Sequence, residues 1–465
     1  MSNLFAALRG SADALSIFER QLSVAQNNVA NASTPGYVRQ RLSLQARPFD
    51  PNGGIEGGVT TGPLESARDI YAEAAVQREL TSSGKWQQQV DTLTSLQTNF
   101  DLTGEGGIPG ALNQLYESFS SWGVTPNDAT ARNGVITAAQ NVVSAFNTTA
   151  GQLSRASSDA DTQIKSLVEQ VNSLSKRIQQ YNTQRQAGNR DPAIDAGMYS
   201  AVEELSELVP VTTLKQSDGS MTVLLGGQTP LVVGEFQYSI GANVASSAGL
   251  VDSAGRDITA QVTSGKLGGL LDLRNNLFAS LRGDGSQQGG LNQLAQAFAD
   301  RVNGLLTAGN ISDGPPPVPG VPLFTYDAAG STNVAATLAL DPAVTADQLA
   351  AIDPGPPYAS NGIPLALAQL SSPTSPADKI GNASYAQFYG SLAAAVGNAA
   401  SNAKSNYSLQ QDLVTQARDL RQQSSGVSLD EEAINVLQFQ RSYQAAAKMI
   451  SVLDELTQTV VNLIR

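Results

Sequence analysis

The C-terminal stretch Val436–Ile464, VLQFQRSYQAAAKMISVLDELTQTVVNLI, repeats apolar residues at alternating steps of three and four. A stripe with a mean period of 3.5 residues stays on one face of a helix and is typical of a coiled-coil seam. So narrow an apolar face needs a partner helix to be stable in water. The members of this C-terminal seam are Val436, Phe439, Tyr443, Ala446, Ile450, Leu453, Thr457, Val460 and Ile464.

The N-terminus carries a second seam with the same rhythm. Its members are Leu4, Leu8, Ser11, Leu15, Phe18, Leu22, Ala25 and Val29. The simplest prediction is that the two terminal helices pack against each other, or against copies of themselves in an assembly. Periodicity alone leaves an alternative open, because two amphipathic helices buried in a globular core give a similar pattern.

The sequence beside each seam predicts where its helix ends or begins. The first helix runs into NNVANASTPGYVR at residues 27–39, and the last follows SSGVSLDEE at residues 424–432. Asn and Ser after the first seam are weak helix formers, and Pro35-Gly36 is a turn signal. Ser428 is placed to cap the last helix, with Glu431 three residues later as its capping-box partner.

Composition excludes many kinds of active site. The chain has 465 residues, a formal charge of −13, and neither cysteine nor histidine. It therefore cannot form disulfides, thiolate nucleophiles, imidazole bases or zinc sites with nitrogen or sulfur ligands, and we expect no cofactor and no metal. The acidic balance makes nucleic acid an improbable partner, and no apolar run is long enough to span a membrane.

Patterns along the chain predict a mainly α protein with β insertions. A discontinuous helical, coiled-coil domain is expected from residues 1–208, 265–312 and 377–465. It includes one long helix from Asp128 towards Gly188, either continuous or broken near residues 150–159. Residues 209–264 have period-two strands and an Asp218-Gly219 hairpin turn, which predicts an inserted β domain. Residues 313–376 are rich in proline and predict a second, loop-rich insertion.

The two terminal strings resemble the signatures of the bacterial flagellar axial proteins, the rod, hook and hook-associated proteins. The β segment around Asp218-Gly219-Ser220 and the string Gly265-Lys266-Leu267-Gly268-Gly269-Leu270-Leu271 are similar to those of the hook-associated members at the hook–filament junction. The resemblance implies a structural, non-enzymatic protein of the extracellular flagellum, exported through the flagellar type III channel without a cleaved signal. A hook or rod protein is the alternative within this family.

The resemblance also implies partners and assembly residues. The partners would be copies of this chain, the hook protein, a second junction protein and an export chaperone that binds the C-terminal helix. Residues Thr34, Pro35, Gly36 and Tyr37 would set the path of the chain after the first helix. The seam positions expected at the assembly interface are Leu8, Leu15, Leu22, Tyr443, Ile450 and Leu453.

Two further functions can be weighed from short motifs. Ser173-Leu174-Ser175-Lys176, Ser217-Asp218-Gly219 and Lys266-Leu267-Gly268 approximate the three elements of a serine acyl-transfer site. Two of the three are imperfect, so a serine hydrolase is disfavoured. Arg282-Gly283-Asp284 matches a tripeptide used by some adhesive ligands, but a glycine-rich turn accounts for it equally well.

Overall fold

The computed structural model describes residues 2–50, 55–97, 106–244, 249–314, 316–327, 330, 332–355 and 357–464, with no account of the side chains of residues 2–5, 49–50, 55–56 and 463–464. The chain divides into two compact units. Unit 1 comprises Met1–Ser83, Gln170–Ile240 and Leu409–Arg465, and unit 2 comprises Gly84–Glu169 and Gly241–Ser408. Each unit is therefore assembled from segments far apart in the sequence.

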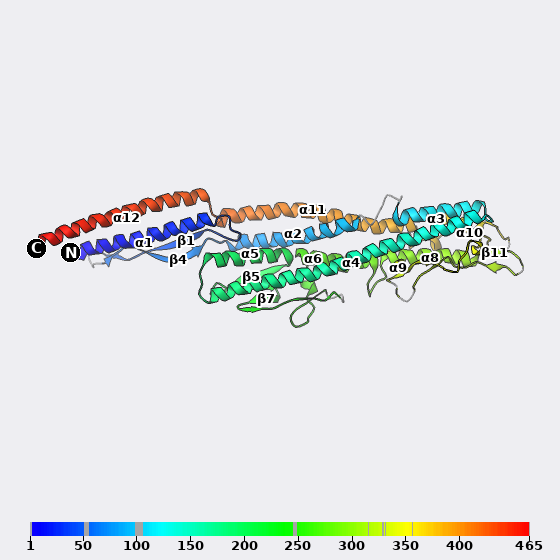
Figure 1. Ribbon diagram of the computed structural model, residues 1–465, viewed down its shortest axis with the longest axis horizontal. Helices are drawn as coiled ribbons and strands as arrows, with labels where there is room; N and C mark the ends of the chain where they lie inside the picture. The colour runs from blue at the N-terminus through cyan, green and yellow to red at the C-terminus, as the bar shows by residue number, and fades with distance from the viewer. Residues whose placement is uncertain are drawn as a thin grey trace. The chain divides into compact units, whose positions relative to one another are not determined.

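The two ends of the chain form a helical pair in unit 1. Helices α1 (Ser2–Ala30) and α12 (Leu429–Ile464) lie side by side (Figure 1). Helix α1 also contacts an antiparallel hairpin of β1 (Gln40–Ala46) and β4 (Val59–Ser66). The shorter antiparallel pair β2 (Phe49–Asp50) and β3 (Ile55–Glu56) lies between β1 and β4 in the chain. The predicted pairing of the terminal helices is confirmed.

The remainder of unit 1 packs helices against a small sheet. It contains α5 (Pro192–Leu208) and parts of α2 (Ile70–Gln97), α4 (Ala129–Gln186) and α11 (Tyr385–Ser425). The antiparallel sheet has the order β5 (Val211–Lys215), β6 (Met221–Leu225), β7 (Thr229–Val233) and β8 (Phe236–Gln237). Where α2 meets α11, Val76, Leu80, Val414 and Ala417 form an apolar cluster.

The sequence patterns predict the long helix and the strands of this sheet, except that the fourth strand is shorter than its pattern. Helix α4 is continuous over 58 residues, and the Asp128 carboxylate caps it by accepting from the Thr130 amide at 2.8 Å. Strands β5, β6 and β7 lie where the period-two pattern placed them. The alternating pattern of the sequence continues to Ile240, but the fourth strand ends at Gln237. Asn172 on α4 binds the Ile240 amide and carbonyl instead, each at 2.9 Å.

A buried amide on α4 holds the sheet in place. The fully buried Asn182 donates to the carbonyls of Met221 at 2.8 Å and Gly234 at 2.9 Å, and accepts from the Met221 amide at 2.8 Å. We expect Asn182→Leu to destabilise unit 1 by about 3 kcal/mol, because it leaves buried backbone groups without partners. Hydrogen exchange in peptides of β6 and β7 measures this. Asn172→Leu serves as a partly buried comparison, and equal effects would contradict the burial argument.

Unit 2 is built around aromatic side chains. Its main helices are α3 (Gly107–Val124), α8 (Gly290–Ala308), α6 (Gly265–Asp272) and α7 (Ala279–Arg282), with a π-helical turn at Leu273–Phe278. The Phe298 ring on α8 makes edge-on contacts with Tyr116 and Tyr385, with centroids 6.4 and 5.4 Å apart. Such geometry aligns the positive ring edge with the negative face of its neighbour.

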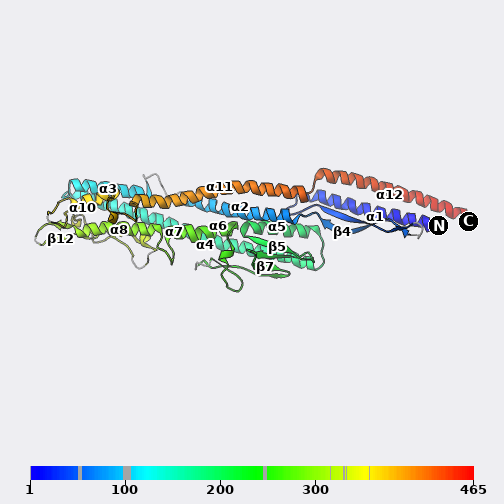
Figure 2. The same ribbon diagram turned by 180° about the vertical axis from the view of Figure 1, so that it is seen from behind.

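The proline-rich segment of unit 2 is mostly irregular, as predicted. The short strands in and beside it are β11 (Asn310–Ser312), β12 (Val318–Pro319), β13 (Phe324–Thr325) and β14 (Ala339–Leu340), and its short helices are α9 (Val334–Thr337) and α10 (Gly362–Ala368). Turns of 3₁₀ helix lie at Ala346–Gln348, Gln369–Ser371 and Pro376–Asp378. Earlier in unit 2, before α6, lie the strand pair β9 (Gly241–Ala242) and β10 (Leu250–Val251) and a 3₁₀ turn at Thr259–Gln261. Figure 2 shows the structure from behind, with β12 and α10 of this list labelled.

Candidate assembly interface

The α1–α12 pair shields the predicted seams from solvent to different degrees. On α12, Ala446 is 8% exposed, and Ile450 and Leu453 are half-buried. On α1, Leu8, Leu15 and Leu22 are half-buried, whereas Ser11 and Ala25 are buried. The seam is not covered uniformly, since Tyr443 is 37% exposed and Val29 is 41% exposed. The side chains of Leu4 and Ile464 lie outside those described.

A second apolar stripe on α12 is exposed to solvent. Its large side chains lie between 45% and 64% exposed. At 100° per residue they span a sector of roughly 120°, which begins beside the seam at Met449 and Leu456 and extends away from it to Leu437. We call this set the outer stripe: Ile434, Leu437, Met449, Val452 and Leu456. The outer stripe was not predicted, because the seam dominates the periodicity of this helix, although steps of three and four also relate Met449, Val452 and Leu456.

The turn after α1 is closed by side chains of the 27–39 string. The Asn28 amide donates to the Gln40 carbonyl and accepts from the Gln40 amide, each at 2.9 Å, so it acts as a strand partner for β1. The Tyr37 hydroxyl donates to Asn27 and Asn28 at 2.9 Å. Burial, with nearby Glu432 and Asp191, raises the pKa of Tyr37 to about 12, so this hydroxyl keeps its proton.

The predicted path-setting residues occupy distinct places in this turn. The Thr34 hydroxyl donates to Asn31 at 3.2 Å, and Pro35 is exposed. Gly36 has φ +73°, and a Cβ there would lie 2.3 Å from the Ala196 carbonyl oxygen on α5. Glycine therefore meets two requirements at once, a left-handed backbone and a close approach to another helix.

An arginine connects this turn to the start of α12. Arg39 pairs with Glu431 at 2.7 Å and with the buried Glu432 at 2.6 Å, and its amide donates to the Ser425 carbonyl at 3.0 Å. The Ser428 hydroxyl accepts from the Glu431 amide at 3.4 Å, which provides the serine half of the predicted capping box. The Glu431 carboxylate binds Arg39, so this acid links the two ends of the chain.

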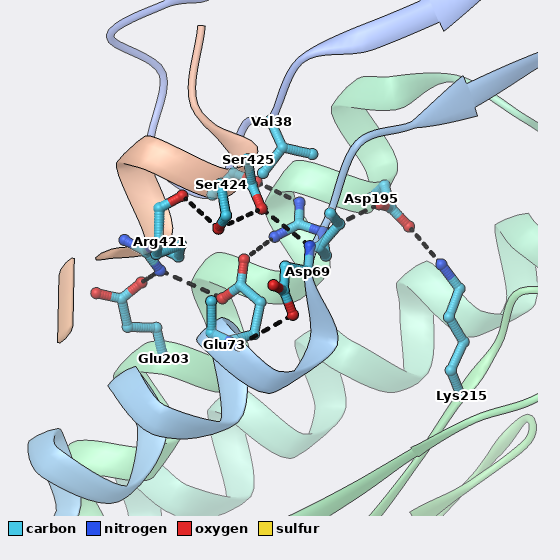
Figure 3. Close-up of polar contacts among 12 residues, drawn as sticks. Val38, Asp69, Glu73, Asp195, Glu203, Lys215, Arg421, Ser424 and Ser425 are labelled. Atoms are coloured by element: carbon cyan, nitrogen blue, oxygen red, sulfur yellow. Dashed lines mark hydrogen bonds and ion pairs between the residues drawn. The ribbon is translucent and has the colours of Figure 1, made fainter. Parts of the chain in front are cut away.

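A group of charged residues lies directly beneath the turn (Figure 3). Arg68 binds Glu73, lies 3.6 Å from the Asp195 carboxylate, and stacks on the Tyr199 ring with its guanidinium carbon 3.6 Å from the centroid. Arg421 pairs with Glu73 at 3.3 Å and Glu203 at 2.8 Å. We call this set the charged clasp: Arg68, Glu73, Asp195, Glu203 and Arg421.

The charged clasp was not predicted from the sequence. Its members come from three helices and one connecting segment, and no local spacing relates them. One signal was available, because Asp195 lies among mostly apolar residues on the buried face of α5. Charged residues at such positions are rarely buried unless they are paired.

The clasp makes unit 1 sensitive to acid through Glu203. Burial would raise the pKa of Glu203, but hydrogen bonds and charge from Arg421 and Arg418 outweigh it and lower the pKa below 4.5. A carboxylate with a lowered folded-state pKa stabilises the protein above its unfolded pKa, and this contribution is lost as the pH falls through the folded value.

We therefore expect Glu203→Gln to destabilise unit 1 at neutral pH, with the difference from the parent shrinking below pH 4.5. Asp13→Asn is the control, because the Asp13–Arg47 pair is about half exposed and should contribute little. Denaturant unfolding at several pH values, monitored by hydrogen exchange, measures the stability of both variants. A deficit in Glu203→Gln that persists unchanged in acid would contradict this assignment.

The structure places the serine-type motif residues far apart. Gln186 on α4 donates to Asp218 at 3.3 Å, and Ser173 lies 13 residues earlier on the same continuous helix. At ~1.5 Å per residue that separation is about 20 Å, too far for one acyl-transfer site. In unit 2, Asp284 of the Arg-Gly-Asp tripeptide accepts from Ser286 and the Gln287 amide. Within the described residues no group of three or more acidic side chains could hold a metal, and no helix is long and apolar enough to cross a membrane.

Comparison with protein families matches three regions of the chain. Residues 93–324 match the helical domain of the flagellar hook-associated protein FlgK. Residues 8–37 match the flagella basal body rod protein family, and residues 421–463 match the C-terminal family of the flagellar basal body rod FlgEFG proteins. The two terminal matches coincide with the seams and the strings beside them.

Whole-chain relatives agree with these families. The chain is 26% identical to flagellar hook-associated protein 1 of Bacillus subtilis, over 99% of each chain. It is 22% identical to the protein of that name in Escherichia coli, over 97% of this chain and 98% of the relative. The flagellar hook junction protein FlgK of Burkholderia pseudomallei has a similar fold, with TM-score 0.63 and 17% identity over 75% of this chain and 99% of that one.

Proposed function

The chain belongs to the flagellar hook-associated protein 1 family, and on that premise we propose that it is a structural subunit of the hook–filament junction, on which the filament is assembled. The observation that carries the proposal is the α1–α12 pair, in which the most distant parts of the sequence form one helical layer. The internal match over residues 93–324 favours this role over that of a rod or hook protein, whose families match the termini alone.

Within the junction, the terminal pair would pack side by side with copies of itself, and the inserted β and proline-rich segments would face outward. The seam positions hold α1 and α12 together in each subunit. The outer stripe is then the surface available to neighbours, because it exposes five large apolar side chains on one side of α12. Exposed apolar stripes of this kind are typical of protein–protein contacts.

The remaining partners follow from the same role. The hook protein and a second junction protein would contact the two ends of the ring of subunits. Before assembly the outer stripe would need protection from water, which suits an export chaperone bound to the C-terminal helix. The subunit would reach the flagellum through the type III channel without a cleaved signal. Neither the seams nor the outer stripe calls for catalysis.

Binding to isolated hook–basal bodies tests the proposal. The bodies come from a strain that lacks this gene, and labelled protein is located by electron microscopy. We expect label confined to the distal hook tip, after which added flagellin polymerises. Label along the hook or at the rod would place the protein elsewhere in the axial structure, and no binding would overturn the structural role.

A variant separates the outer stripe from the seam. Val452→Asp adds a charge to the outer stripe, where the side chain is 45% exposed, so the subunit should fold but fail to bind the hook tip. Gln458→Asp adds the same charge at an exposed polar position and should bind normally. Normal binding of Val452→Asp would remove the outer stripe from the interface without affecting the assignment of the junction role.

A further inference from the structure

We propose that Arg68 is the positioning residue for the turn after α1, and that through this turn it keeps the α1–α12 pair ordered in the free subunit. The Arg68 Nη2 atom donates to the Gly36 carbonyl at 2.6 Å. The Arg68 side chain is 4% exposed, so this contact is shielded from competing water. The inference concerns the free subunit and does not depend on the assembly role.

The position of Arg68 in the chain gives it this influence. It lies in the short connection between β4 and α2. Next to it, the Ala67 amide donates to the Arg39 carbonyl at 2.9 Å and the Asp69 amide donates to the Ser425 hydroxyl at 2.9 Å. The three segments that connect the terminal layer to the rest of unit 1 therefore meet at Arg68 and its two chain neighbours.

The other groups around Arg68 fix its orientation. Glu73 binds one side of the guanidinium, Asp195 lies on another, and the Tyr199 ring covers its face. A planar, always charged guanidinium can make these contacts simultaneously, whereas a lysine ammonium cannot. The geometry leaves one Nη atom directed at the Gly36 carbonyl, which is a hydrogen bond to a charged donor and thus among the stronger kinds.

Loss of Arg68 should not unfold unit 1, because each acid of the clasp keeps another cation. Glu73 retains Arg421 at 3.3 Å, and Asp195 retains Arg185 at 3.7 Å and Lys215 at 3.8 Å. The Gly36 carbonyl, in contrast, loses its charged donor. The effect of Arg68→Met should therefore concentrate at the turn and in the helices that it connects.

Hydrogen exchange of the full-length monomer, followed by mass spectrometry, tests this inference. In Arg68→Met we expect peptides covering residues 27–40 and the first turns of α12 to exchange roughly tenfold faster or more, as expected for losing a charged hydrogen bond. Peptides of β5–β7 should change little. Arg47→Met is the matched control, because Arg47 forms an exposed pair with Asp13 in the same layer, and it should leave the turn unchanged.

Arg68→Lys extends the test if Arg68→Met fails to fold. It keeps the charge but not the fork of donors, so exchange at the turn should lie between the rates of the parent and of a variant without the donor. Unchanged protection at residues 27–40 in either folded variant would overturn the inference. A uniform increase over all of unit 1, including β5–β7, would also overturn it, because that result describes a general stability role.

Discussion

Leu453→Asp should abolish assembly at the hook tip while leaving the β5–β8 sheet folded. Leu453 is half-buried in the seam against α1, so an aspartate there loses apolar contact and places a charge at the helix–helix interface. We expect a cost of about 2–3 kcal/mol to the α1–α12 pair. Each 1.4 kcal/mol changes an equilibrium constant about tenfold, so the ratio of ordered to disordered pairs should fall roughly 30- to 140-fold.

Neighbouring positions on α12 supply the comparison. Val452→Asp changes the adjacent residue on the outer stripe, and Gln458→Asp an exposed polar one. Swimming and hook-tip labelling report assembly, and hydrogen exchange reports the helical pair. Leu453→Asp should lose protection in both α1 and α12, whereas Val452→Asp should keep it. If Leu453→Asp still supports swimming, the seam does not hold the subunit in its assembled form.

The main architecture could be predicted because it follows from patterns that relate neighbouring residues and continue over many turns of helix. The 3.5-residue repeats around Leu15 and Ile450 extend over many turns, so they predict both a helix and the face that needs a partner. The change to period two after Val209 likewise predicts the sheet, and Asp218-Gly219 its first hairpin. These signals depend on residues near each other in sequence, and the structure confirms them.

The charged clasp and the outer stripe could not be predicted in the same way. Arg68 and Arg421 are 353 residues apart, which follows from their positions in the sequence, yet both bind Glu73. Nothing local indicates such a meeting. The exposure of Met449 and Leu456 depends on which face of α12 receives α1, and hydrophobicity alone does not decide that. The path-setting string was predicted as a turn, but its contact with α5 required the fold.

Gly36→Ala should be among the most destabilising single-methyl additions in unit 1. The left-handed backbone at φ +73° costs an alanine about 1–2 kcal/mol. The new Cβ would lie 2.3 Å from the Ala196 carbonyl oxygen and 3.0 Å from the Ser200 amide nitrogen, so backbone atoms of α5 or of the turn must move. Together we expect about 3 kcal/mol or more, with the loss greatest at the turn that Arg68 holds.

Two other glycines separate backbone strain from the steric clash. Gly188 has φ +85° with nothing within 4 Å of an added Cβ, so Gly188→Ala should incur the backbone strain alone. Gly10 lies within α1 with the same open surroundings, and Gly10→Ala should stabilise that helix by about 1 kcal/mol.

Both tryptophans of the chain, Trp86 and Trp122, belong to unit 2, so tryptophan fluorescence would not report on unit 1 directly. Hydrogen exchange over residues 27–40 compares the protection of the turn in all three variants. Equal losses of protection in Gly36→Ala and Gly188→Ala would show that α5 does not confine the turn.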